Sequence, residues 1–176
     1  MPQKRRLALA LGVVLVLTSA AGGASAATAA PIPDEESTAT AISIVVAAFP
    51  NADVRQIGPD AEIRILTSNG RAQTVFLGGR TFGPASSPLR IINSSAVTLT
   101  GPVDPTLAIR LLSENSSGLP YGYWALSKVT TDGKRTLVYE VEVRADPPAA
   151  AVQAIIVNVA KTADAMEAEL TGKDVF

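Results

Sequence analysis

Two glutamates near the end of the chain come closest, in type and spacing, to a catalytic pair. Glu140 and Glu142 alternate with apolar residues between 136 and 144, which is the clearest strand pattern in the sequence. Two residues apart on a strand, they share one face, with side chains about 7 Å apart. Such a pair suits a glycosidase or a set of calcium ligands. The simpler interpretation, which we favour, is a solvated outer face opposite a buried one.

Three aromatic residues form the second candidate site. In a strand, Trp124 shares a face with Leu126, whereas Tyr121 and Tyr123 share the opposite face. We expect Trp124 in the core and the tyrosines at the border of the sheet. The alternative is an aromatic surface for a peptide or a sugar. Tyr121, Tyr123 and Trp124 are therefore the candidate binding residues.

Several kinds of catalysis are excluded by composition, because the chain contains no histidine and no cysteine. This removes Ser-His-Asp and Cys-His arrangements, thiol catalysis and most transition-metal sites. A Ser-Lys dyad is not expected either, because Ser127 and Lys128 are adjacent on a strand and point to opposite faces. We therefore predict a protein that is not an enzyme, with no catalytic residues, no metal and no cofactor.

The acidic residues near the C-terminus are likewise interpreted as solvated surface groups. Asp164, Glu167 and Glu169 are expected on the polar side of an amphipathic helix, and no calcium-loop motif surrounds them.

The chain begins with the features of a secretory signal peptide. Lys4, Arg5 and Arg6 precede an uncharged apolar run from residue 7 to 17, and small residues follow. The run is too short for a comfortable membrane span, which takes about 20 residues. We predict cleavage after Ala26, a flexible leader over 27–36 and a single domain over 37–176. An uncleaved anchor is the alternative, and a lipoprotein anchor is excluded because there is no cysteine.

Charge and cysteine content indicate the setting of the mature protein. Removal of the three basic residues of the signal leaves 12 basic against 16 acidic residues, so the mature chain is mildly acidic. The basic residues are dispersed, and we expect no nucleic-acid partner. An exported chain without disulfides is more typical of bacteria than of animals. We predict a bacterial protein that is periplasmic or extracellular, with no membrane anchor after cleavage.

Hydrophobic periodicity predicts an α+β fold with the element order α-β-β-β-α-β-β-α. Asp104-Pro105 and Asp146-Pro147 are expected to start helices, and Gly172 to end the last one. Ser68-Asn69-Gly70 is a hairpin signal, and short connections indicate an antiparallel sheet flanked by helices. Leu107, Leu111 and Leu112 are expected as the buried stripe of the middle helix. The expected helices cover 37–49, 104–115 and 147–170; the expected strands cover 61–66, 74–77, part of 89–99, 121–129 and 136–144.

Residues 104–176 resemble the YbjN and type III secretion chaperone-like families. In those families a helix ending near "LN" leads to a "G-x-aromatic-x-L" strand, another strand and a final "A-D-x-(L/Y)-E" helix. The matching phrases here are Glu114-Asn115, YGYWAL at 121–126, LVYEVEV at 137–143 and VAKTADAMEAEL at 159–170. The resemblance implies an antiparallel sheet flanked by helices, frequent dimers and, for the chaperones, binding of extended client segments. Unlike those cytoplasmic chaperones, this chain has a predicted signal peptide.

These observations predict a non-enzymatic exported module that binds a protein or peptide segment and forms a possible homodimer. Two alternatives stay open. One is a carboxylate-type enzyme acting on cell-wall glycan through Glu140 and Glu142, and the other is a structural envelope protein.

Overall fold

Six antiparallel strands form one sheet, in the spatial order β1-β2-β3-β4-β6-β5. The computed structural model describes residues 34–67, 70–117, 119 and 121–176. The predicted signal peptide and most of the predicted leader therefore lie outside the described residues. The elements are α1 (Asp34–Ala48), β1 (Val54–Ile57), β2 (Asp60–Leu66), β3 (Ala72–Leu77), β4 (Leu89–Thr100), α2 (Pro105–Ser117), β5 (Tyr123–Leu126), β6 (Lys134–Arg144) and α3 (Ala149–Thr171).

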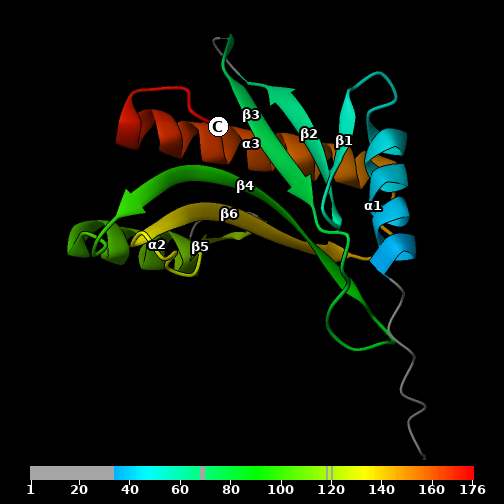
Figure 1. Cartoon of the computed structure of the whole chain (residues 1–176), viewed down its shortest axis with the longest axis horizontal. Helices are drawn as coiled ribbons and strands as arrows, with labels where there is room; N and C mark the ends of the chain where they lie inside the picture. The colour runs from blue at the N-terminus through cyan, green and yellow to red at the C-terminus, as the bar shows by residue number, and fades with distance from the viewer. Residues whose placement is uncertain (1–33, 68–69, 118, 120) are drawn as a thin grey trace, which may run out of the picture.

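The helices cover one face of the sheet and leave the other open. Helix α3 packs across β3, β4 and β6, and α1 packs against α3 and the β1–β3 end. Figure 1 shows β3 in front of α3, with α1 beside β1 and α2 beside β5. Ile63, Val75, Ile92, Tyr139 and Val141 are buried beneath the helices. The predicted α+β fold with helices flanking an antiparallel sheet is confirmed.

The two halves of the sheet meet along a short contact between β3 and β4. The paired residues of the two strands are Phe76 with Asn93 and Leu77 with Ile92, and the Gly78 N–H donates to the Ile91 carbonyl at 2.8 Å just beyond them. Farther along, side chains bridge the strands: Ser94 Oγ donates a hydrogen bond to the Thr74 carbonyl at 2.6 Å. The neighbouring β4–β6 ladder is long and contains a bulge between residues 95 and 97. The sheet is therefore continuous, but its two halves are joined along a short stretch of β3 and β4.

Several predicted boundaries change. Helix α1 begins at Asp34, before the predicted start. The short strand β1, which lies between α1 and the first predicted strand, was not predicted. It pairs with β2 across a tight turn at Gly58. Helix α3 begins at Ala149 without a side-chain cap, so the predicted start at Asp146-Pro147 is wrong. Asp146 instead pairs with Arg144 at 3.4 Å.

The predicted helix signals around α2 are confirmed in part. Asp104 Oδ1 accepts hydrogen bonds from the backbone N–H groups of Thr106 and Leu107, which makes it the N-cap. Leu111 is buried, but Leu112 is 69% exposed, so its predicted burial is wrong. The reason is that α2 lies along β5 and buries only a narrow stripe. No helix among the described residues is long and apolar enough to cross a membrane.

Candidate functional site

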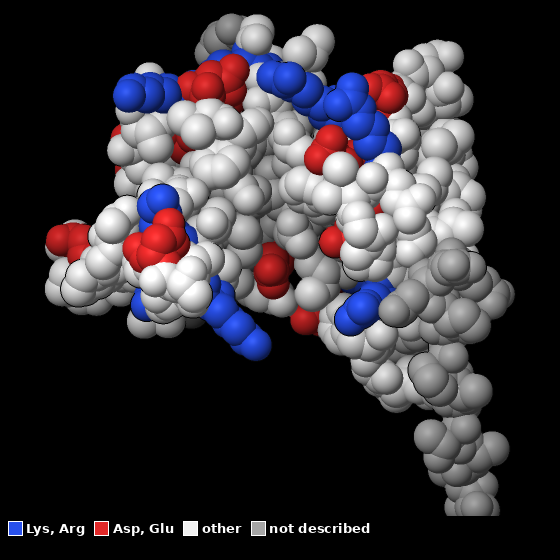
Figure 2. Space-filling view, in the orientation of Figure 1, with Lys and Arg blue, Asp and Glu red and all other residues white. Residues whose placement is uncertain are grey.

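The open face of the sheet carries a row of polar and aromatic side chains. Cross-strand register aligns Glu62 with Phe76, Phe76 with Asn93, Asn93 with Glu140, and Glu140 with Tyr123. Directly paired residues point to the same face, so the row crosses five strands on the side away from the helices. Figure 2 shows acidic side chains in the hollow near the centre of the visible surface. The open face therefore carries Glu140 and Tyr123, two of the residues singled out from the sequence.

Glu140 and Glu142 lie on this open face beside Tyr121 and Tyr123. Tyr123 is directly opposite Glu140, and its hydroxyl donates a long hydrogen bond of 3.4 Å to Glu142 Oε1. Tyr121 is 65% exposed. An open pocket of about 420 Å³ lies here, and it is lined by Leu119, Tyr121, Gly122, Tyr123 and Glu142. We call these two tyrosines and two glutamates the Tyr–Glu cluster.

The carboxylates of the Tyr–Glu cluster have no basic partner among the residues that the structure describes. Burial raises the pKa of Glu140, and the negative charge of Glu142 adds to this, while the hydrogen bond from Tyr123 acts the other way. Burial also raises the pKa of Tyr123 to about 12, helped by the two carboxylates. Both shifts mean that the ionised forms of these groups are less stable in the cluster than in water.

A glycine brings the tyrosines against the sheet. A Cβ atom at Gly122 would lie 2.2 Å from the carbonyl oxygen of Glu140 and 2.8 Å from Cγ2 of Val141. The absence of a side chain is therefore what lets the chain between Tyr121 and Tyr123 run so close to β6.

Trp124 lies on the other side of β5, in the core, where it is 6% exposed. Its ring packs on Tyr139 at a centroid distance of 5.1 Å, and its Nε1 donates to Glu114 Oε2 at 2.8 Å. Trp124 and the two tyrosines thus lie on opposite faces, as predicted. Of the three candidate binding residues, Tyr121 and Tyr123 are available to a ligand on the open face, and Trp124 is not.

A second hollow lies on the same face and was not predicted from the sequence. Its volume is about 330 Å³, and its lining residues are Pro59, Asp60, Gly78, Arg80, Thr81, Phe82, Ile91 and Asn93. Ile91 pairs with Glu142, and Asn93 pairs with Glu140, so the hollow adjoins the Tyr–Glu cluster across β4 and β6. No local sequence signal marks this hollow, because it forms between segments that are distant in the chain.

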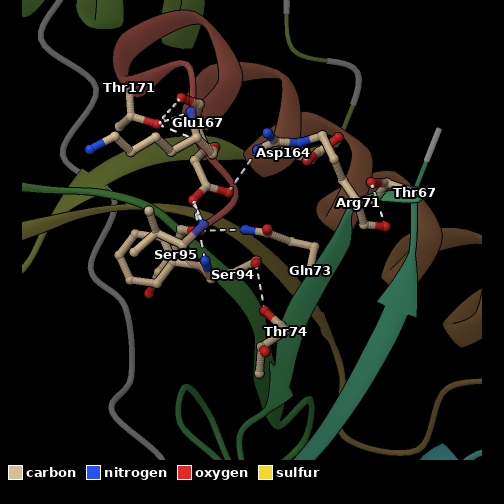
Figure 3. Close-up of polar contacts among 12 residues, drawn as sticks. Thr67, Arg71, Gln73, Thr74, Ser94, Ser95, Asp164, Glu167 and Thr171 are labelled. Atoms are coloured by element: carbon tan, nitrogen blue, oxygen red, sulfur yellow. Dashed lines mark hydrogen bonds and ion pairs between the residues drawn. The ribbon is translucent and has the colours of Figure 1, made fainter. Parts of the chain in front are cut away.

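The acidic residues of α3 have a different role from the one predicted. Asp164 and Glu167 are buried rather than solvated, and Glu167 is fully buried. Arg71, directly before β3, donates to Asp164 Oδ1 at 2.5 Å and to Glu167 Oε2 at 3.1 Å (Figure 3). Glu167 Oε1 also accepts the backbone N–H groups of Val175 and Phe176. This cluster ties β3, α3 and the C-terminus together.

Asp174 adds a third carboxylate to that cluster, with oxygens of the three acids within 4.8 Å of one another. Because the Arg71 guanidinium already occupies the position between Asp164 and Glu167, we interpret the group as a structural ion cluster. Glu169, the remaining predicted surface acid, pairs with Arg110 of α2.

The stability of the fold should depend on the ionisation of Tyr123 at high pH. Its pKa of about 12 in the folded protein lies above the ordinary value of 10. The protonated form is thus favoured by folding, and this stabilisation is fully present below pH 10 and lost as the pH rises towards 12. Urea unfolding at pH 8 and pH 11 should show a larger loss of stability for the unsubstituted chain than for Tyr123→Phe. Equal losses for the two proteins would contradict the raised pKa.

The chain matches no protein-family model and no curated protein.

Proposed function

We propose that this chain is a non-enzymatic, exported bacterial protein that binds an extended protein or peptide segment on the open face of its sheet. The observation that carries the proposal is the Tyr–Glu cluster, in which aromatic rings and carboxylates lie beside an open pocket, with no basic partner for the carboxylates in the described part of the chain. The predicted signal peptide and the resemblance to YbjN and secretion-chaperone families support the same proposal.

The cluster has the energetic character of a binding site. A half-buried glutamate with a raised pKa, next to a second glutamate, lowers the stability of the fold at neutral pH. The sheet needs neither carboxylate for its packing, because the side chains of β6 that fill the core lie on the opposite face. Perturbed groups that do not support the fold are typical of functional sites.

The chemistry of the cluster favours a basic side chain. A lysine or arginine head placed between Glu140 and Glu142 would neutralise both carboxylates, and the rings of Tyr121 and Tyr123 offer cation–π contacts. The second hollow adds an apolar surface at Phe82 and Ile91. Two strand spacings, about 10 Å, separate β4 from β5, which is the reach of roughly three extended residues. The preferred segment therefore carries a basic residue and, about three residues away, an apolar one.

Selection from a random twelve-residue peptide library tests this proposal. Peptides retained by the mature chain should be enriched in Lys or Arg, with an apolar or aromatic residue about three positions away. Binding of the selected peptides should weaken as salt concentration rises, because part of the attraction is between charges. A selection that enriches no sequence, or enriches acidic peptides, would overturn the proposal.

Removal of one carboxylate should separate binding from stability. Glu140→Gln is expected to weaken binding of a selected basic peptide about tenfold, since it removes a charge-assisted contact. The same variant should be more stable than the unsubstituted chain at pH 7, because it removes a charge that burial opposes. The stability difference should shrink below the ordinary glutamate pKa of 4.5, where the carboxyl is protonated in both states. Peptide titrations and urea unfolding at pH 7 and pH 4 measure the two effects.

Glu62→Gln is the matched control for Glu140→Gln. It makes the same change of charge on the same face of the sheet, but on β2, three strands away from β6. Peptide affinity should change little. An equal loss of affinity in both variants would show that net charge, rather than the Tyr–Glu cluster, determines binding.

A further inference from the structure

A hollow on the helix side of the sheet lies between α2 and α3. Helix α2 packs along β5, whereas α3 packs across β3, β4 and β6. The hollow between the two helices has a volume of about 330 Å³, and its wall is mostly apolar, with Leu119, Trp124, Ala165 and Met166 among its lining residues. A concave site of this size and lining is typical of those that bind small molecules.

An arginine of α2 spans the rim of this hollow. Arg110 Nη2 donates to Glu169 Oε2 of α3 at 2.9 Å, and its Nη1 donates to Glu169 Oε1. Arg110 Nε donates to Glu114 Oε1 at 2.7 Å, and Glu114 Oε2 accepts from Trp124 Nε1 at 2.8 Å. Every carboxylate oxygen of the two glutamates therefore already accepts a hydrogen bond, and these three charged groups are committed to one another.

Lys161 and Thr162, two consecutive residues of α3, also line the hollow. Within the described part of the chain, neither the Lys161 ammonium nor the Thr162 hydroxyl has a hydrogen-bond or ion-pair partner. An ammonium offers three N–H donors and a hydroxyl offers one, which suits the two oxygens of a carboxylate. The hollow thus combines an apolar wall with a cation and a hydroxyl that are free to bind an anion.

We propose that this hollow binds a small amphipathic carboxylate, such as a medium-chain fatty acid. The apolar body lies against Trp124 and Met166, and the carboxylate accepts hydrogen bonds from Lys161 and Thr162. Liquid water takes about 30 Å³ per molecule, so the hollow holds roughly ten non-hydrogen atoms, the size of octanoate. A two-chain lipid is too large for it. The inference does not rest on peptide binding at the open face.

Titration with octanoate tests the proposal. Trp124 is the single tryptophan of the chain and lines the hollow, so its emission reports occupancy. Octanoate should change this emission along a saturable curve with a submillimolar midpoint, and calorimetry should give the same midpoint. Octan-1-ol has the same apolar body without the charge and should bind roughly tenfold more weakly. The absence of saturable binding, or equal affinities for the acid and the alcohol, would overturn the proposal.

Lys161→Met tests the contact with the carboxylate. The variant keeps an apolar stem, so octanoate should bind it only about as tightly as octan-1-ol does, while the affinity for octan-1-ol should stay unchanged. Lys128→Met is the matched control, because Lys128 is an exposed lysine outside the lining of the hollow. It should bind octanoate as the unsubstituted chain does. Equal losses in the two variants would show an effect of net charge and contradict the role of Lys161.

Ala165→Leu tests the location of the site. Ala165 lines the hollow but is exposed, so a larger side chain there fills the hollow without crowding the core. Both octanoate and octan-1-ol should lose affinity, by roughly tenfold or more. Leu119 also lines the pocket of the Tyr–Glu cluster, and Glu140→Gln therefore serves as the control for that neighbouring site. Unchanged binding to Ala165→Leu, or a loss in Glu140→Gln, would place the ligand outside the hollow and overturn the proposal.

Discussion

Replacement of Arg71 by methionine is expected to lower the melting temperature by on the order of 10 °C. Arg71 is the basic residue that donates to both Asp164 and Glu167. Methionine keeps much of the side-chain volume but leaves the two buried carboxylates without their cation. Removal of one partner of a buried ion pair is among the most destabilising changes known, because the charge that stays behind is neither solvated nor paired. Thermal unfolding followed by circular dichroism measures the effect.

A triple variant tests whether the uncompensated charge is the cause. Arg71→Met combined with Asp164→Asn and Glu167→Gln removes all three charges and should recover most of the lost melting temperature. Arg55→Met is the control for loss of an ion pair as such. Arg55 pairs with Asp53 at 2.6 Å on the surface, where both side chains are more than two-thirds exposed, and its replacement should have little effect. A triple variant as unstable as Arg71→Met would contradict the explanation.

Gly122→Ala is expected to cost about 1–3 kcal/mol of unfolding free energy and to abolish peptide binding. The new methyl group would overlap the carbonyl oxygen of Glu140, which is backbone and can move only with its strand. The chain before β5 must therefore shift away from β6, and Tyr121 and Tyr123 shift with it. Urea unfolding and titration with a selected basic peptide measure the two losses.

Gly78→Ala is the control for Gly122→Ala. A Cβ atom at Gly78 would lie 3.3 Å from the Ile91 carbonyl oxygen, which a small adjustment relieves. Its cost in unfolding free energy should be clearly smaller than that of Gly122→Ala. Equal costs for the two variants would show that the close approach at Gly122 is not the cause of the destabilisation.

The open face and the buried ion cluster are related through the position of α3. The cluster around Arg71 holds α3 to β3 on one side of the sheet, together with the packing of Val152, Ile156 and Val159 in the core. The helices are thus committed to that side, and the row from Glu62 to Tyr123 stays accessible. Loss of the cluster should weaken the fold as a whole, whereas substitutions in the Tyr–Glu cluster should act on binding.

Local signals in the sequence were sufficient for several features. Alternation from 136 to 144 placed Leu137, Tyr139 and Val141 on the face opposite Glu140 and Glu142, and the structure has this arrangement. The N-cap at Asp104 and the left-handed glycine at Gly172 also follow from residue type alone. These features depend on neighbours within a few residues, so the sequence contains all that determines them.

Glu140 and Glu142 show the limit of what local signals determine. Their spacing determined that they share a face of one strand. Only the tertiary structure decided that this face stays uncovered, that Tyr123 from β5 lies opposite Glu140, and that a hollow adjoins them. Asp164 and Glu167 are the converse case, since their polar character predicted exposure and Arg71, more than ninety positions away, allows burial. Periodicity encodes which side chains share a face, but contacts between distant segments decide what covers that face.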